Sequence, residues 1–88
     1  MVLDGDAANL RHIARHGVTR KEAEEAVLIE PFEADVQQHE REERVLCFGR
    51  TRSGRLLTIL YTERRRRIRV ITAYDVTREQ QRLYFEGK

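Results

Sequence analysis

The only proline of the chain, Pro31, divides the sequence into a helical part and a part rich in β-formers. Before it, apolar residues recur at three- and four-residue spacing, the period of an amphipathic helix. After it, short apolar runs alternate with charged residues and turn signals, as in the strands of an antiparallel sheet. Helices followed by a series of strands are typical of an α+β fold. The 88 residues suffice for one such domain, 1–88, and not for a second core.

Three helices are predicted, two before Pro31 and one near the end of the chain. Side-chain caps and glycine mark their boundaries. The predicted boundaries are Asp6 as N-cap and Gly17 as the end of the first helix, a Thr19–Glu22 capping box for a second helix over residues 20–29, and a Thr77–Gln80 capping box for the third.

Four strands are predicted between the second and third helices, over residues 32–37, 44–49, 56–63 and 67–73. A Ser-Gly pair at 53–54 and the arginine run 64–66 mark two turns, and residues 38–43 make a polar connection. In the last strand Ile68 and Val70 alternate with Arg67 and Arg69, so one face is apolar and the other cationic. We expect an antiparallel meander without a parallel pair, with the two N-terminal helices packed on one side.

Charge is segregated along the chain, although the net charge is only +2. Residues 19–43 contain nine acidic and three basic side chains, whereas residues 50–69 contain eight arginines and one glutamate. Guanidinium groups match phosphate oxygens in a bidentate way. The basic half therefore predicts a surface for a polyanion; the alternative is that these arginines are solvated hairpin ends.

Other functional classes find little support in the sequence. The longest apolar run, residues 56–61, is far shorter than the roughly 20 residues of a membrane helix, and the first residues lack a signal-peptide pattern. We therefore expect a cytoplasmic protein without a membrane partner. Cys47, the single cysteine, lies in an apolar run and is expected to be an inert core thiol. His39 and its neighbouring glutamates lack the spacing of a metal site, so no metal or cofactor is predicted.

Several short motifs stand in a characteristic order and spacing between about residue 6 and residue 84. These motifs are Asp6, Asn9 and His12 followed by His16-Gly17-Val18, then Gly49-Arg50-Thr51, Tyr61-Thr62-Glu63, the run RIRVITA at 67–73, and Thr77 with Arg82 and Tyr84. Together they resemble the pattern of the BrnT family of toxins. The resemblance implies a RelE-like fold and a ribonuclease toxin of a type II toxin–antitoxin pair. It also implies neutralisation by a BrnA-like antitoxin, with RNA as the substrate and DNA contacted only indirectly, through the antitoxin.

RNA cleavage by the neighbouring 2′-hydroxyl needs a base, an acid, and cations for the phosphorane that forms. We expect Arg64, Arg67 and Arg69 to supply the cations without a metal ion. Tyr74 stands where many family members have an arginine after Thr-Ala. Together with His16 at a helix C-terminus, it is a candidate for proton transfer; alternatively, His16 only caps its helix.

Further cations are expected to bind the RNA backbone, namely Arg50, Arg52, Arg55, Arg65 and Lys21. Tyr61 is either a further proton carrier or a half-buried core residue. Glu63 is expected to pair with a neighbouring arginine; the alternative is that it acts as a base. The antitoxin is expected to cover the arginine-rich side or the free edge of the sheet. The alternative function is a non-catalytic RNA-binding or protein-interaction module on the same scaffold.

Overall fold

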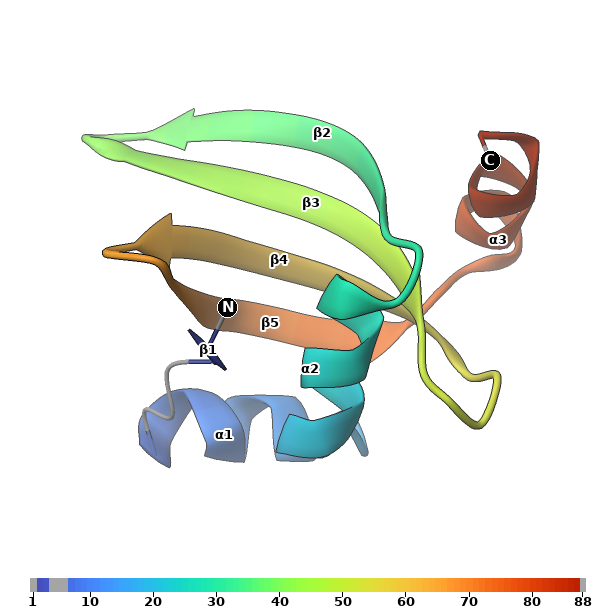
Figure 1. The fold of residues 1–88 in the computed structure, drawn as a ribbon, viewed down its shortest axis with the longest axis horizontal. Coiled ribbons are helices and arrows are strands. Elements are labelled where there is room, and N and C mark those ends of the chain that lie inside the picture. The colour runs from blue at the N-terminus through green and yellow to red at the C-terminus, as the bar shows by residue number, and fades with distance from the viewer. Residues whose placement is uncertain (1, 4–6, 88) are drawn as a thin grey trace.

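Within residues 2–3 and 7–87, which the computed structural model describes, three helices lie around one sheet in an α+β arrangement (Figure 1). The elements are β1 (Val2–Leu3), α1 (Ala7–Ala14), α2 (Arg20–Leu28), β2 (Phe32–His39), β3 (Glu42–Arg50), β4 (Leu56–Arg64), β5 (Arg67–Asp75) and α3 (Arg78–Glu86). The four long strands form the predicted antiparallel meander, and the sheet order is β1-β5-β4-β3-β2.

The sheet contains one strand more than predicted. β1 pairs parallel with β5, with Val2 opposite Arg67 and Leu3 opposite Ile68. The prediction of a sheet without a parallel pair is therefore wrong at this edge. Periodicity did not reveal β1 because two residues are too few to show an alternating pattern. On the opposite edge, β2 is a long strand with one unpaired side.

Two capping boxes begin α2 and α3, as predicted. The hydroxyl of Thr19 accepts a hydrogen bond from the amide of Glu22 (3.1 Å), and the Glu22 carboxylate accepts one from the amide of Thr19 (3.0 Å). Thr77 and Gln80 make the same reciprocal pair at 3.1 and 3.0 Å. Four amides that would otherwise lack a partner are satisfied in this way, which fixes where the two helices begin.

α1 ends in a Schellman motif centred on Gly17, whose φ is +71°. The amide of Val18 donates to the carbonyl of Ile13 (3.2 Å), and that of Gly17 donates to the carbonyl of Ala14 (2.9 Å). Ile13 and Val18 are each 1% exposed, which is the apolar contact that accompanies this motif. The predicted helix end at Gly17 is confirmed, whereas the predicted N-cap, Asp6, lies outside the described residues.

The two faces of the sheet have different environments. On the face that we call the α2 side, β3 to β5 pack against α1 and α2 around the main core, whose members are Ile13, Val18, Ala23, Ala26, Val27, Cys47, Leu57, Ile59, Ile68, Val70 and Ala73. α2 approaches β3 so closely that a Cβ added at Gly49 would overlap the Ala26 carbonyl. The opposite face, which we call the α3 side, meets α3 at one end, where Thr58 donates a hydrogen bond to Gln80 (2.8 Å).

A β-bulge in β5 decides which side chains share the α3 side. Leu60 pairs with Thr72 and Tyr61 pairs with Val70, so Ile71 is an extra residue in the ladder. The predicted alternation holds up to Val70 and then reverses. Tyr74, opposite Thr58, consequently lies on the same face as Arg67 and Arg69, whereas an unbroken alternation would place it on the other face.

The strands are longer than predicted at the hairpin ends. The polar connection predicted over residues 38–43 is only Glu40 and Arg41, because His39 still pairs with Glu42. The second hairpin turns through Arg65 and Arg66, both with positive φ. Both hairpin tips lie at the end of the sheet away from α3 (Figure 1).

Candidate functional site

Four arginines from three strands gather on the α3 side near the hairpin tips. Arg44 of β3 and Arg69 of β5 both pair with Thr62 of β4, from its two sides. Arg64 and Arg67 face each other where the β4–β5 hairpin begins. We call Arg44, Arg64, Arg67 and Arg69 the arginine cluster. Sequence analysis missed Arg44 because the register that brings it opposite Thr62 cannot be derived from local patterns.

The cluster is only partly neutralised. Glu42 forms ion pairs with Arg44 (3.2 Å) and Arg64 (3.9 Å), beside a shallow depression of about 280 Å³ that His39, Glu40 and Arg41 also line. In the part of the chain that the structure describes, no carboxylate pairs with Arg67 or Arg69. Both side chains are exposed, so their guanidinium groups are accessible to an anion.

A group of two histidines, a threonine and a tyrosine lies where α1 meets β5. The rings of His16 and Tyr74 are 6.3 Å apart between centroids, and those of His12 and His16 are 5.7 Å apart. His12 Nε2 lies 3.2 Å from the hydroxyl of Thr72. The structure thus brings the predicted residues His16 and Tyr74 together and adds His12. His16 occupies the C-cap position of α1, and its ring lies near Tyr74 from that position.

Three of the arginines predicted to bind RNA meet carboxylates on or next to α2. Within this group the acidic and basic halves of the sequence come together. The ion pairs are Arg50–Glu30 at 3.8 Å, Arg52–Glu25 at 3.7 Å and Arg55–Glu22 at 3.1 Å.

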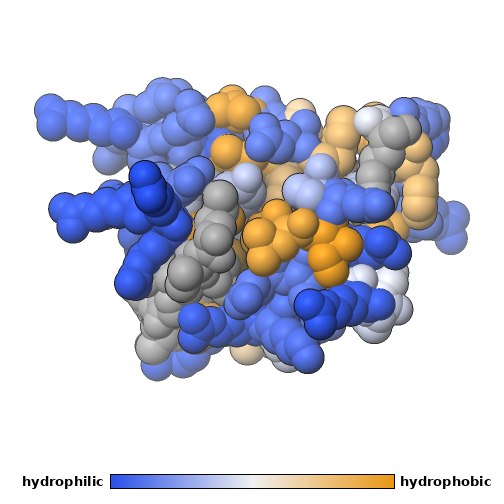
Figure 2. Space-filling model, viewed as in Figure 1, coloured by the Kyte–Doolittle hydropathy of each residue, from blue (hydrophilic) through white to orange (hydrophobic). Residues whose placement is uncertain are grey.

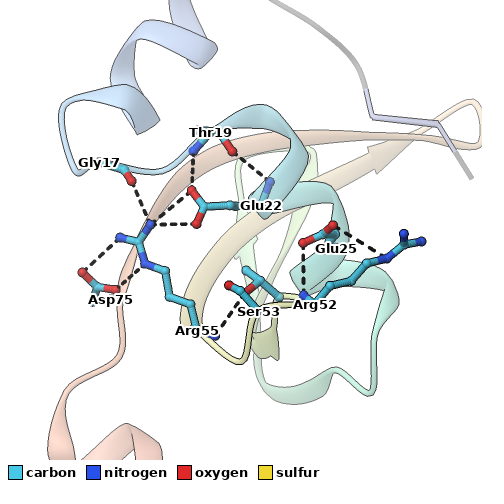
Figure 3. A network of polar contacts seen from close by, with 9 residues as sticks. Gly17, Thr19, Glu22, Glu25, Arg52, Ser53, Arg55 and Asp75 are labelled. Carbon is cyan, nitrogen blue, oxygen red and sulfur yellow. Dashed lines mark hydrogen bonds and ion pairs between the residues drawn. The ribbon is translucent and has the colours of Figure 1, made fainter.

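Arg55 is the centre of a polar network that joins α2 to the end of β5 (Figure 3). Its guanidinium donates to both oxygens of Asp75 (2.8 and 3.1 Å) and to both oxygens of Glu22 (3.1 Å each). It also donates to the carbonyl of Gly17 (2.8 Å). The hydrogen bonds with Asp75 raise the pKa of Arg55 and lower the pKa of Asp75. The pKa of Glu22 is lowered by the amide of Thr19 and then by Arg55. This geometry assigns Arg55 a structural role.

Lys21 and Arg65, also predicted to bind RNA, lie apart from each other. Lys21 is exposed in the first turn of α2, and Arg65 is exposed at the tip of the β4–β5 hairpin. Nothing in the structure tests RNA contacts by either residue, or by Arg50, Arg52 and Arg55, so these contacts stay predictions.

Tyr61, Glu63 and Cys47 face the α2 side, away from the arginine cluster. Burial, followed by the nearby Cys47, Glu33 and Glu63, raises the pKa of Tyr61 to about 12. Burial likewise raises the pKa of Cys47 to about 12, as expected for a core thiol. The predicted pairing of Glu63 with an arginine is wrong. Strand alternation puts Glu63 and its neighbour Arg64 on opposite faces of the sheet, and the described residues contain no ion pair of Glu63. Among the same residues, no group of three side chains is placed to hold a metal ion.

The fold and the site define a small α+β protein with a cationic sheet face, beside which lie a tyrosine and a histidine. Such a face suits the binding and polarisation of phosphodiesters. The chain belongs to the BrnT family, the ribonuclease toxins of type II toxin–antitoxin systems, whose family model matches residues 6–80. The resemblance noted from the sequence is thereby confirmed, and membership implies an antitoxin partner and an RNA target. Comparison with curated protein sequences gave no match. No helix among the described residues is long and apolar enough to cross a membrane.

Proposed function

We propose that the chain is a metal-independent endoribonuclease that cleaves RNA on the α3 side of its sheet. The observation that carries the proposal is that Arg67 and Arg69 are exposed on this face without an ion pair among the described residues. In this proposal α1 and α2 cover the other face, in a RelE-like arrangement, and the RNA backbone lies across the arginine cluster.

The reaction is an attack of a ribose 2′-oxygen on the adjacent phosphorus atom. A new P–O bond forms while the 2′-hydroxyl gives its proton to a base, and the P–O5′ bond breaks as the leaving oxygen takes a proton from an acid. The products are a 2′,3′-cyclic phosphate and a 5′-hydroxyl. Arg69, with Arg64 or Arg67, stabilises the negative charge that develops on the phosphorane.

Proton transfer is assigned to Tyr74 and His16. Tyr74 lies on the same face as the arginine cluster because of the bulge at Ile71, and the ring of His16 lies beside it. Histidine is the side chain that most often serves as a general acid or base in catalysis. Arg44 joins the cluster as a phosphate-binding residue, and Arg65 extends it at the hairpin tip.

The partner proposed for this enzyme is a BrnA-like antitoxin in the cytoplasm. A type II antitoxin is a protein that binds its toxin directly, and DNA contacts of the pair are assigned to the antitoxin. The support for an antitoxin partner is the family to which the chain belongs. The arginine cluster is assigned to RNA, not to DNA.

The test is cleavage of RNA by the purified chain in the presence of a chelator. Arg69→Ala is expected to lower the cleavage rate by about 10² to 10³, the usual loss for one transition-state donor. Arg69→Lys is expected to restore only part of the rate, because a point charge cannot make a paired contact. Arg11→Ala, on α1, is the matched control and should cleave like wild type.

Thermal melts of all variants separate loss of chemistry from loss of fold. Because the Arg69 side chain is exposed, its removal leaves no cavity, and the melting temperature should stay close to that of wild type. Undiminished cleavage by Arg69→Ala would remove this residue from the site. Tight RNA binding without any cleavage by wild type would favour the non-catalytic module instead.

A further inference from the structure

The helices do not cover the whole α2 side of the sheet. One row of apolar side chains crosses this face, in which Val36 pairs with Val45, Val45 with Tyr61, and Tyr61 with Val70. Exposure rises along the row, from 3% at Val70 to 52% at Val36, while Val45 and Tyr61 are half-buried. The core is therefore closed over β5 and open toward β2.

A further exposed apolar side chain lies at the C-terminal end of α2, where Leu28 is 51% exposed. Figure 2 views the molecule from the α2 side and shows apolar surface over this end of α2 and over β2. We call these two apolar areas together, Leu28 at the end of α2 and the row of Val36, Val45 and Tyr61 on the sheet, the α2-side patch. Clustered apolar surface with a polar rim is typical of an interaction site.

Three carboxylates border the patch and make its rim acidic. Glu43 and Glu63 lie on the same face as Val45 and Tyr61, two residues along the same strands. Glu33 pairs with Cys47 and lies on this face as well. None of these carboxylates forms an ion pair with the described residues. A segment that covers the patch is therefore expected to be apolar at its centre and basic at its borders.

We propose that the α2-side patch docks an amphipathic helix with basic flanks that belongs to the antitoxin. The inference rests on the partner that the proposed function requires. It places that partner on the face opposite the arginine cluster, and so departs from the expectation, drawn from the sequence, of the arginine-rich side or the free edge of the sheet. A helix fits because the patch spans three strands beside α2, where it would continue the existing helical layer. The free edge of β2 suits an added strand less well, because a bulge between Glu33 and Asp35 interrupts it.

A second copy of the chain fits the patch less well than a basic partner. A symmetric dimer through this surface would place the carboxylates of Glu33, Glu43 and Glu63 near their own counterparts. Like charges brought together at an interface oppose association. The charge pattern therefore favours a partner of different composition.

The first experiment measures binding of the purified chain to the antitoxin of its own operon. The double variant Leu28→Asp with Val36→Asp is expected to raise Kd by about 100-fold, because it puts charge into the centre of the interface. The matched control is Leu83→Asp with Phe85→Asp, which changes two apolar side chains of α3 that are 41% and 62% exposed. This control should bind within about 3-fold of wild type.

The second experiment tests the charge of the partner without altering the apolar contact. Neutralising Glu33, Glu43 and Glu63 to glutamine should lower the association rate by about 10-fold at low salt and flatten its salt dependence. The matched control neutralises Glu40, Glu79 and Glu86, which are exposed and without ion pairs among the described residues. Hydrogen exchange of the complex should show protection of β2 and of the end of α2.

Two results would overturn the proposal. One is wild-type affinity in the Leu28→Asp with Val36→Asp variant, with exchange protection confined to the arginine cluster. The other is a dimer of the isolated chain, seen by sedimentation, that the same variant dissociates. RNA cleavage by the isolated wild type is measured in parallel. If cleavage fails while the binding results hold, the ribonuclease mechanism is wrong and the docking site stands.

Discussion

At the scale of single residues, Arg55 connects three separate parts of the fold, and no motif in the sequence indicates this role. Its guanidinium contacts the loop before α2, the first turn of α2 and the end of β5. Only 27% of this side chain is exposed, and the Glu22 side chain is similarly covered at 25%. Their ion pair is therefore less screened by water than one at the open surface, where such pairs contribute little.

This network predicts a pH-dependent stability. Since the folded state lowers the pKa of Glu22 and Asp75, the stabilisation is complete above their unfolded values, about 4.5 and 3.8, and it is lost as the pH falls through the lower folded values. Glu22→Gln keeps the capping acceptor but loses the charge, so it should cost about 1 kcal/mol near pH 7 and little near pH 3. Urea unfolding across this range measures the difference. Glu24→Gln, at an exposed position of α2, should show no such change, and a pH-independent loss in Glu22→Gln would contradict the explanation.

At the scale of elements, the β4–β5 hairpin makes its turn with two residues that are poorly suited to it. Arg65 and Arg66 have φ values of +53° and +64°. Positive φ at both central residues is the pattern of a type I′ turn, which favours Asn-Gly. In residues other than glycine and asparagine, this backbone conformation is strained. The turn thus places two cations at the hairpin tip at the expense of stability.

The strain predicts that Arg65→Asn with Arg66→Gly will increase the free energy of unfolding by about 1 kcal/mol. The same variant should bind RNA more weakly, because it removes two cations. Denaturant unfolding and RNA titration test the two effects separately. Unchanged or lower stability would show that these arginines are accommodated without strain, and unchanged RNA affinity would remove the hairpin tip from the proposed surface.

At the scale of the whole molecule, strand alternation sorts charge onto two faces of one sheet. Adjacent pairs such as Glu43-Arg44 and Glu63-Arg64 send their carboxylates to the α2 side and their guanidinium groups to the α3 side. Net charge therefore describes neither surface. In the two proposals made above, the cationic face binds RNA, and the face with the carboxylates and the apolar patch binds the partner.

This separation of charge onto two faces predicts that the position of an arginine matters more for RNA affinity than the net charge of the protein. Arg44→Ala should weaken RNA binding about 3- to 10-fold and reduce the salt slope by about 0.7, the value for one phosphate contact on a single strand. Arg11→Ala changes the net charge by the same amount, but it lies on α1 and should change little. Fluorescence anisotropy with labelled RNA at several salt concentrations compares them. Equal losses for both variants would contradict a face-specific RNA surface.

The sequence by itself determined the local features of this protein. The capping boxes at Thr19 and Thr77, the end of α1 at Gly17 and the alternation of Ile68 and Val70 with arginine were all predicted and are present. Each depends on hydrogen bonds or on strand geometry within a few residues. Such features need no knowledge of the remaining chain.

Tertiary structure alone decided how the site is composed. The bulge at Ile71 moves Tyr74 to the arginine face, and the β3–β4 register brings Arg44 opposite Thr62. The pairing of Arg55 with Glu22, which are 33 residues apart, gives this arginine a structural role that the sequence does not indicate. Bulges, registers and long-range ion pairs are set by how helices and strands pack together. They decide the composition of the site, since a shift of one residue reverses the face of every side chain beyond it.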